Sequence, residues 1–336
     1  MKVNRIEKIP VHIVSGFLGA GKTTFLNKFI KHNQPKRIFV IENEIGKVNI
    51  DGALVMEGTE EVLELTAGCL CCNLNGELYD LLFDLIDRSD EFDMLLIETT
   101  GIADPSAVAE TFWSSTHLDK FFDLKSTIIV ADALNLPYAV ANNEEARRQI
   151  AFADVILLNK IDAVEPFLQA EVENIMKGLN PNVTVFKGTF GDFPHETICN
   201  LSAFSIDEQE KTNCLVKINH EYGHSSIKTF SLTFDRPFLF KELTWRLSTL
   251  MRFNQNQIYR IKGIIEIEDV TNRVILQTVF QSFRFTDGTD WEENEEKISK
   301  IVFIGNGVEK ASIERIFNQC LVAKKAINHQ KVKQYV

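Results

Sequence analysis

A glycine-rich loop between an apolar strand and a helix constrains the fold of this chain more than any other feature. Residues 16–24 read GFLGAGKTT and match the pattern G-x-x-x-x-G-K-[ST] in full. The apolar run at 11–14 predicts a buried strand before the loop, and residues 24–30 predict a helix after it. This context disfavours the alternative, a glycine-rich turn with a surface lysine. The order of strand, loop and helix therefore predicts a site for the phosphates of a nucleoside triphosphate.

Each kind of residue in this phosphate loop has a physical role. Glycines let backbone N–H groups close around phosphate oxygens without a Cβ clash, and the helix N-terminus adds positive potential. Lys22 can reach the β- and γ-phosphates, and the hydroxyl of Thr23 can ligate Mg²⁺. The nucleotide-binding residues that we predict in this loop are Gly16, Gly19, Ala20, Gly21, Lys22, Thr23 and Thr24.

A second motif, Asn159-Lys160-Ile161-Asp162, predicts which base is recognised. It directly follows the apolar run at 155–158, which predicts another strand. The carboxylate of Asp162 can accept hydrogen bonds from N1–H and the 2-amino group of guanine, whereas adenine has no matching donors. Asn159 can tie the phosphate loop to this strand, and the stem of Lys160 can cover the base. The two motifs together predict a site for GTP and GDP.

An acidic residue ends a third apolar strand, at 94–97. Glu98 follows this strand and is our candidate for a direct or indirect Mg²⁺ ligand, and Gly101 can bring its backbone N–H close to the γ-phosphate. The segment 41–46 follows a strand expected at 37–40 and is the candidate for the first nucleotide-sensing switch. We predict Lys22, Glu42 and Glu98 as the catalytic residues. An ordinary acidic strand end is the alternative for Glu98.

Three of the six cysteines lie within four positions, as Cys69, Cys71 and Cys72. The sequence shows no signal peptide and no apolar stretch near 18 residues, so we expect a reducing cytoplasm, where a metal site is favoured over disulfides. Three thiolates form an incomplete tetrahedral Zn²⁺ shell, and Glu42 is a candidate for a further ligand. The alternative is that these cysteines are small buried hydrophobic residues, which we favour for Cys199, Cys214 and Cys320.

The chain resembles the CobW-like family of P-loop GTPases, which are metallochaperones related to the urease and hydrogenase accessory GTPases. The resemblance covers roughly residues 8 to 323 and implies GTP hydrolysis coupled to the handling of Zn²⁺ or another metal such as Co²⁺, with a client metalloprotein as partner. C-x-C-C between the phosphate loop and E-T-T-G is the most specific feature. The segments that carry the resemblance are residues 16–24, 42–44, 68–72, 98–105, 159–162, 259–263 and 302–305.

Three departures limit what this resemblance implies. Lys47 stands where some relatives carry an acidic residue, so an additional acidic metal ligand is not expected there. His220 and His224 are the only counterpart of the histidine-rich linker found in many members, and two solvated loop histidines are the alternative to a metal site. The cysteine-proline docking extension of some eukaryotic members has no counterpart before the first strand, which leaves the client open.

Composition and periodicity predict a two-domain protein. The chain has 336 residues, and its net charge of −11 disfavours binding to nucleic acid or to an anionic membrane. We expect a doubly wound α/β domain with a mostly parallel sheet at 1–195, a linker at 196–226, a smaller α+β domain at 227–325 and a tail at 326–336. The sequence does not decide whether the chain forms a homo-oligomer.

Two other functions are compatible with these motifs. One is a P-loop kinase or ligase in which the cysteines are structural, although the guanine motif and the lack of an obvious acceptor site count against it. The other is a non-catalytic metal store or metal-sensing regulator that binds GTP without turnover. Phosphate release from GTP, measured with and without Zn²⁺, separates the second alternative from a chaperone that hydrolyses GTP.

Overall fold

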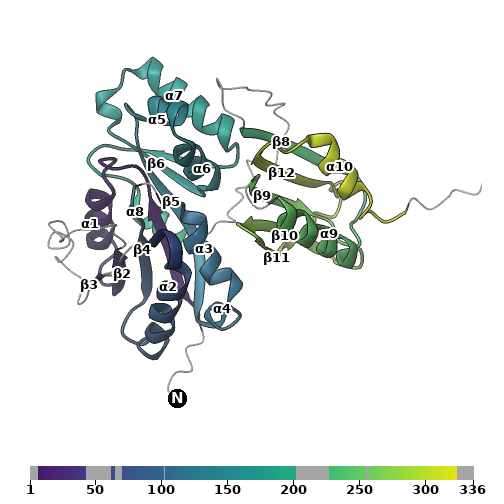
Figure 1. Ribbon diagram of the computed structural model, residues 1–336, viewed down its shortest axis with the longest axis horizontal. Helices are drawn as coiled ribbons and strands as arrows, with labels where there is room; N and C mark the ends of the chain where they lie inside the picture. The colour runs from purple at the N-terminus through teal and green to yellow at the C-terminus, as the bar shows by residue number, and fades with distance from the viewer. Residues whose placement is uncertain are drawn as a thin grey trace, which may run out of the picture.

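The computed structural model describes residues 7–42, 62–64, 70–101, 103–201, 227–254 and 257–323. For residues 42, 62–64, 70–75 and 77 the description covers the backbone alone. The described residues form two domains, each built around its own β-sheet (Figure 1).

The first domain is built on a seven-stranded parallel sheet with the order β3-β2-β4-β1-β5-β6-β7. The first strand lies at the centre, where Ile13 is in register with Ile97 on one side and Thr127 on the other. Because the strands are parallel, all their carboxyl ends lie at the same edge, where the sequence motifs also lie. The strands are β1 (Ile9–Ser15), β2 (Ile38–Glu42), β3 (Val62–Glu64), β4 (Met94–Glu98), β5 (Phe122–Asp132), β6 (Val155–Asn159) and β7 (Thr184–Lys187).

Helices cover both faces of this sheet because successive strand residues point to opposite sides. Val14 and Ile128 pack against α1 (Lys22–His32) and α8 (His195–Asn200). Their neighbours Ile13 and Ile129 pack on the opposite face. The helices on that face are α2 (Leu70–Asp87), α3 (Pro105–Ser114), α4 (Leu118–Phe121), α5 (Leu136–Asn142), α6 (Glu144–Phe152) and α7 (Pro166–Leu179).

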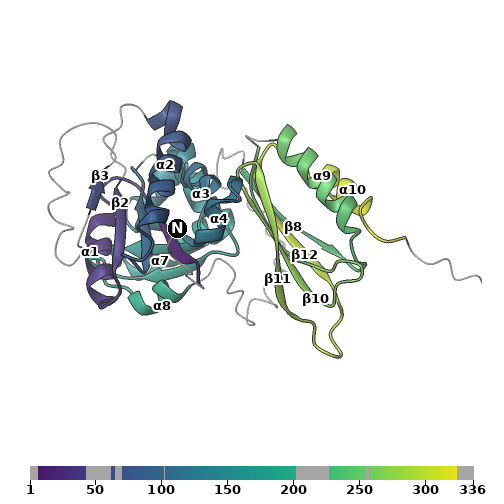
Figure 2. The same ribbon diagram turned by 90° about the horizontal axis from the view of Figure 1, so that it is seen from below.

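The second domain is an antiparallel five-stranded sheet with two helices on one face. The strand order is β11-β10-β9-β12-β8. Ile301 and Phe303 pack under the helices, whereas Val302 and Ile304 face the first domain. Figure 2 shows the sheet between the helices and the first domain. The elements are β8 (Ile227–Phe234), α9 (Phe240–Phe253), β9 (Ile258–Ile265), β10 (Asn272–Val279), β11 (Ser282–Asp290), β12 (Ser299–Asn306) and α10 (Lys310–Asn318).

The predicted fold class, a doubly wound parallel sheet with a smaller α+β domain, is confirmed. Three element bounds bear on the predicted site and domains. Helix α2 begins at Leu70, so Cys71 and Cys72 lie in its first turn. Helix α10 ends at Asn318, because the chain then bends and the Leu239 N–H donates to the Cys320 carbonyl. Helix α8 extends to Asn200, within the segment predicted as linker, and the domain boundaries remain predictions.

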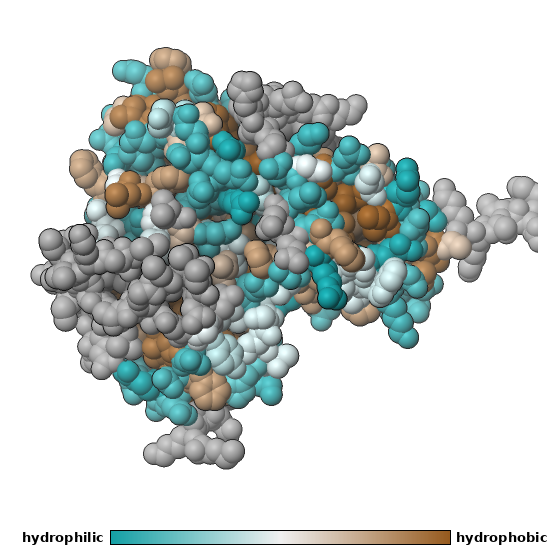
Figure 3. Space-filling view, viewed as in Figure 1, coloured by the Kyte–Doolittle hydropathy of each residue, from teal (hydrophilic) through white to brown (hydrophobic). Residues whose placement is uncertain are grey.

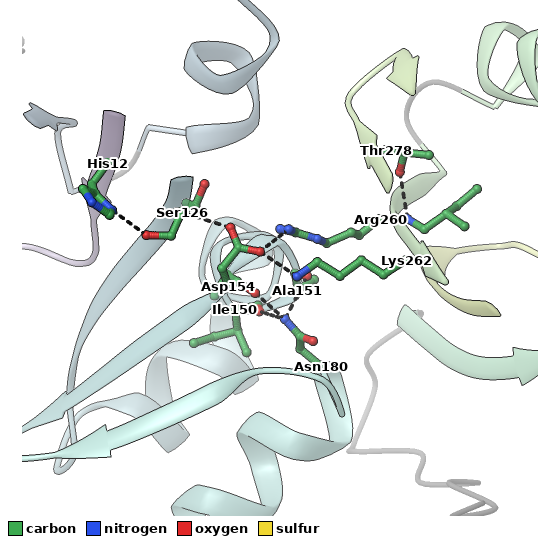
Figure 4. A network of polar contacts seen from close by, with 12 residues as sticks. His12, Ser126, Ile150, Ala151, Asp154, Asn180, Arg260, Lys262 and Thr278 are labelled. Carbon is green, nitrogen blue, oxygen red and sulfur yellow. Dashed lines mark hydrogen bonds and ion pairs between the residues drawn. The ribbon is translucent and has the colours of Figure 1, made fainter. Parts of the chain in front are cut away.

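A buried ion cluster and apolar packing join the two domains. Asp154, between α6 and β6, accepts bonds from the Thr127 backbone N–H at 2.8 Å, from Lys262 Nζ at 2.6 Å and from Arg260 (Figure 4). The two cations lie on β9 and hold the pKa of Asp154 below its usual value, although burial alone would raise it. Thr229 on β8 donates to the Leu179 carbonyl of α7 at 2.9 Å.

The surface seen in Figure 3 is mostly hydrophilic, with apolar groups over both domains. Exposed large apolar side chains include Tyr138 on α5, Phe167 on α7 and Phe253 on α9. They are distributed among several elements of both domains. Among the described helices, none is both long and apolar enough to cross a bilayer.

Candidate nucleotide and metal site

The phosphate loop connects β1 to α1 through backbone conformations that favour glycine. Gly16 has φ +136° and Gly21 has φ +102°. A Cβ at Gly16 would lie 2.0 Å from the carbonyl oxygen of Val130, and one at Gly21 would lie 2.4 Å from Asn159 Nδ2. These positions therefore require glycine for space as well as for conformation.

Lys22 begins α1, and its side chain folds back over the loop. Its ammonium group donates to the carbonyl of Gly16 at 2.9 Å and reaches that of Phe17 at 3.5 Å. The side chain is largely buried, so its charge is concentrated on the inner side of the loop. A phosphate oxygen entering the loop can exchange for these carbonyl partners.

Asn159 ties the phosphate loop to β6, as its place in the sequence predicts. Its Nδ2 donates to the Ala20 carbonyl at 2.9 Å, and its Oδ1 accepts from the Gly191 N–H at 3.2 Å. The side chain is only 2 % exposed. Gly191 in turn packs on the first turn of α1, where a Cβ would lie 2.9 Å from the Phe25 nitrogen. One amide thus holds together the phosphate loop, β6 and the loop after β7.

Lys160 lies across the outer side of the phosphate loop. Its backbone is left-handed, with φ 59°, and its ammonium donates to the Gly19 carbonyl at 2.7 Å and to Asp132 Oδ2 at 2.9 Å. Asp132 ends β5, and bonds from Lys160 and Asn135 keep its pKa below the usual value against the opposing effect of burial. Sequence reasoning missed Asp132, although a carboxylate directly after the apolar run at 127–131 is a usable signal.

Asp162, the predicted reader of guanine, lies two residues beyond Lys160. It belongs to the short 3₁₀-helix η1 (Ile161–Ala163), and its side chain is exposed. The N–H of Ile161 donates to the Gly188 carbonyl at 3.4 Å. The loop after β7 therefore lies beside the base-recognition motif.

The segment after β4 contacts the phosphate loop directly. A Cβ at Gly101 would lie 2.7 Å from the Leu18 nitrogen, and the carbonyls of Gly101 and Ala103 accept from Gln149 Nε2 at 3.2 and 3.1 Å. Gln149 lies on α6 and is another functional candidate that sequence reasoning missed. The sequence carries no signal for it, because the contact spans 48 residues.

The carboxyl ends of β1 and β4 fit a Mg²⁺–nucleotide complex. The hydroxyls of Ser15, Thr99 and Thr100 are buried there without a hydrogen-bond partner among the described residues. A bound ligand or ordered water would satisfy such groups. Thr23 lies in the first turn of α1 and Glu98 ends β4, so both predicted Mg²⁺ ligands belong to elements that border this space. Thr24, also predicted to bind phosphate, is exposed on the first turn of α1.

The structure describes the backbone of some of the predicted Zn²⁺ ligands. Glu42 ends β2, and its Cα is in register with Glu98 on one side and Glu64 on the other. Cys71 and Cys72 lie in the first turn of α2, whereas Cys69 lies outside the described residues, as do His220 and His224. Within the described part of the chain, no cluster of three metal-binding side chains is assembled.

The dispersed cysteines behave as structural residues where they are described. Cys199 and Cys320 are free and buried, and burial raises the pKa of Cys320 to about 11. Cys214 lies outside the described residues. The prediction of small buried hydrophobic residues is confirmed for Cys199 and Cys320.

Comparisons with known proteins agree with this geometry over both domains. Residues 10–187 match the CobW/HypB/UreG nucleotide-binding domain, and residues 227–321 match the cobalamin synthesis protein cobW C-terminal domain. The chain belongs to the CobW/HypB/UreG family. The resemblance drawn from the motifs is thereby confirmed.

Several known proteins are similar to this chain over both of its domains. The zinc chaperone YjiA of Escherichia coli K12 is 30 % identical over 327 residues, which cover 93 % of this chain and 98 % of YjiA. The zinc-regulated GTPase metalloprotein activator 1 of Saccharomyces cerevisiae is 28 % identical, covering 95 % of this chain and 85 % of its own. The crystal structure of the Zn(II)-bound YjiA GTPase from E. coli matches with a TM-score of 0.71 at 26 % identity, covering 94 % of this chain and 100 % of YjiA.

Proposed function

We propose that this protein is a GTPase that carries Zn²⁺, or a similar metal such as Co²⁺, to a client metalloprotein. The observation that carries the proposal is the tie between the phosphate loop and the N-K-x-D motif, made by Asn159 and Lys160. The names of the relatives, a zinc chaperone and a zinc-regulated GTPase metalloprotein activator, support the metal and the client.

In this proposal the phosphate loop binds GTP and orients its γ-phosphate. Lys22 exchanges its carbonyl partners for β- and γ-phosphate oxygens, and the loop N–H groups surround the phosphates. Thr23 and Glu98 would hold Mg²⁺, which would offset the negative charge of the phosphates. Asp162 selects guanine, and Gly101 presents its N–H to the γ-phosphate.

Metal binding is assigned to the thiolates of Cys69, Cys71 and Cys72, with Glu42 as a further ligand. Glu42 and Glu98 are adjacent in the sheet, which supports communication between metal and nucleotide. If GTP binding reorders this region, Zn²⁺ must tighten GTP binding by the same factor by which GTP tightens Zn²⁺ binding. Thiolate ligands require a reducing compartment, so we assign the protein to the cytoplasm.

The deciding experiment is a Zn²⁺ titration of the full chain in three states, with a non-hydrolysable GTP analogue, with GDP and without nucleotide. We expect Zn²⁺ affinities that differ by roughly 5- to 150-fold between the first two states. Replacing Cys71 and Cys72 by serine should abolish the difference, whereas the buried Cys199→Ser serves as the matched control. Equal affinities in all states would contradict transfer driven by GTP.

Base selection has its own test. Asp162→Asn should weaken GTP binding and favour xanthosine triphosphate, because the new amide can donate to the 2-oxo group. Competition binding with both nucleotides measures the switch. Equal competition by ATP and GTP in the unmodified protein would contradict the assignment to guanine.

A further inference from the structure

Helix α6 contacts the segment that follows β4. Gln149 on this helix is 1 % exposed, and its Nε2 is shared between the Gly101 and Ala103 carbonyls. Gly101 packs on the backbone of Leu18 at the tip of the phosphate loop. A buried amide of α6 therefore fixes the distance between α6 and the segment assigned to the γ-phosphate.

The residue beside Gln149 faces the second domain. Arg148 donates to Glu144 Oε1 at 3.2 Å, and its guanidinium carbon lies 5.0 Å from the centre of the Tyr259 ring. The Tyr259 hydroxyl donates to the same Glu144 oxygen at 2.8 Å. Arg148 also lines a cavity of about 320 Å³ with Asp104, which caps α3 directly after the β4 segment by accepting from the Ser106 N–H at 2.9 Å.

The other end of α6 is fixed by a separate set of bonds. The amide of Asn180 donates to the carbonyls of Ile150, Ala151 and Ala153 at 3.0, 3.2 and 2.8 Å. Figure 4 shows this amide close to Asp154 and its two cations from β9. Because this end is anchored, a displacement of the second domain at Tyr259 acts on the half of α6 that carries Arg148.

We propose that Gln149 is a positioning residue for GTP hydrolysis, and that the C-terminal domain acts on it through Tyr259 and Arg148. This inference rests on the proposed GTPase function. If the β4 segment differs between GTP and GDP, its carbonyls and the Gln149 amide interact differently in the two states. A contact that differs between the GTP-bound and GDP-bound states gives a coupling free energy between α6 and the nucleotide site. The C-terminal domain then sets the preference of the site for GTP over GDP.

The first test compares two buried amides that each connect α6 to another segment, Gln149 within α6 and Asn180 directly after α7. Gln149→Ala should weaken binding of a non-hydrolysable GTP analogue relative to GDP by roughly 5-fold or more. It should also lower kcat for GTP by about 10-fold while GDP affinity stays within about twofold. Asn180→Ala removes three amide-to-carbonyl bonds at the C-terminal end of α6 without touching the β4 segment, so it should leave the affinity ratio unchanged.

The second test examines the connection between domains with a variant that removes a single hydroxyl. Tyr259→Phe removes the bond to Glu144 but keeps the ring beside Arg148, and should shift the ratio of analogue to GDP affinity by about 5-fold. Thr229→Val is the matched control, because Thr229 makes an interdomain bond of 2.9 Å to the Leu179 carbonyl of α7 and not to α6. It should leave the ratio unchanged.

Specific outcomes would overturn the inference. An unchanged affinity ratio in Gln149→Ala would remove its positioning role, and an equal shift in Asn180→Ala would reduce the effect to general destabilisation. Equal ratios in Tyr259→Phe and Thr229→Val would remove the role of the C-terminal domain. Each of these results leaves GTP hydrolysis by the unmodified protein intact, whereas failure of that hydrolysis would refute the proposed function itself.

Discussion

At the scale of single residues, the buried amide of Asn159 joins three separate segments of the first domain. It uses both ends of its side chain, one toward Ala20 and one toward Gly191. An amide with a donor and an acceptor is needed at this position, because the two partners are a carbonyl and an N–H.

Asn159→Ala should therefore weaken GTP binding by roughly 10- to 100-fold and lower the free energy of unfolding by about 1–3 kcal/mol. Isothermal titration and denaturant unfolding measure the two quantities. Asn33→Ala is the matched control, because Asn33 is buried at the C-terminal end of α1 and its side-chain amide donates to the Phe29 carbonyl at 2.8 Å. A similar loss of GTP affinity in that control would show that the effect is not specific to the loop.

His12 provides a pH-dependent contribution to stability. Burial, with smaller effects from Lys125 and Lys36, lowers its pKa to about 4, and its Nδ1 pairs with Ser126 Oγ at 2.8 Å. The unfolded chain takes up a proton near pH 6.5, whereas the folded chain does not until about pH 4. Stability from this residue is thus fully present above pH 6.5 and is lost as the pH falls toward 4.

Between pH 7.5 and pH 5, His12 should cost the protein about 2 kcal/mol of unfolding free energy. Denaturant unfolding of the unmodified protein and of His12→Asn at both pH values measures this difference. The variant should lose about 2 kcal/mol less on acidification. An identical pH dependence in both proteins would contradict the role of His12.

At the scale of elements, the phosphate loop shows two different requirements for glycine. Gly19 has φ +76° but open space around it, whereas Gly16 combines φ +136° with contact to the β5 backbone. The neighbour of Gly16 is a carbonyl in a central strand, which cannot shift without disturbing the sheet.

Gly16→Ala should therefore cost about 3 kcal/mol or more, whereas Gly19→Ala should cost only about 1 kcal/mol. Thermal unfolding without nucleotide measures both. Comparable losses in the two variants would mean that the steric contact with β5 adds nothing to the backbone strain.

The elements that the sequence predicts well are those encoded by local patterns. Periodicity and glycine placement predict the strand, loop and helix at 9–32. They also predict β6, which leads into the N-K-x-D motif. Helix α6 is harder to predict, since its charged sequence gives only a short apolar pattern. The contacts of Gln149 and Gly191 could not be predicted, because they join segments far apart in the chain.

At the scale of the whole molecule, the interface between the two domains contains a buried cluster of charged side chains. One carboxylate, Asp154, faces two cations from the other domain, and the Arg260 guanidinium also lies 4.7 Å from the Phe152 ring centre at the end of α6. These charged residues can be read from the sequence, but their pairing cannot be predicted, because no local pattern connects Asp154 to a strand more than a hundred positions away.

Arg260→Ala should lower the free energy of unfolding by about 3 kcal/mol, because it leaves a buried carboxylate less well paired. Arg37→Ala is the control. Its pair with Asp93 is half-exposed, so the loss should be about 1 kcal/mol or less. Denaturant unfolding at neutral pH measures both, and equal losses would contradict a special role for the buried cluster.

The central place of β1 determines when the first domain can form. Val11 pairs with Leu95 on one side and Leu124 on the other, so β1 can pair only after long loops to strands made later have closed. In the second domain, β9, β10 and β11 pair with their neighbours in sequence, whereas β12 pairs with β8 and β9. In newly synthesised chains, the region around the phosphate loop should thus stay incompletely folded until β5 has been synthesised. The C-terminal sheet should assemble quickly once its own strands are made.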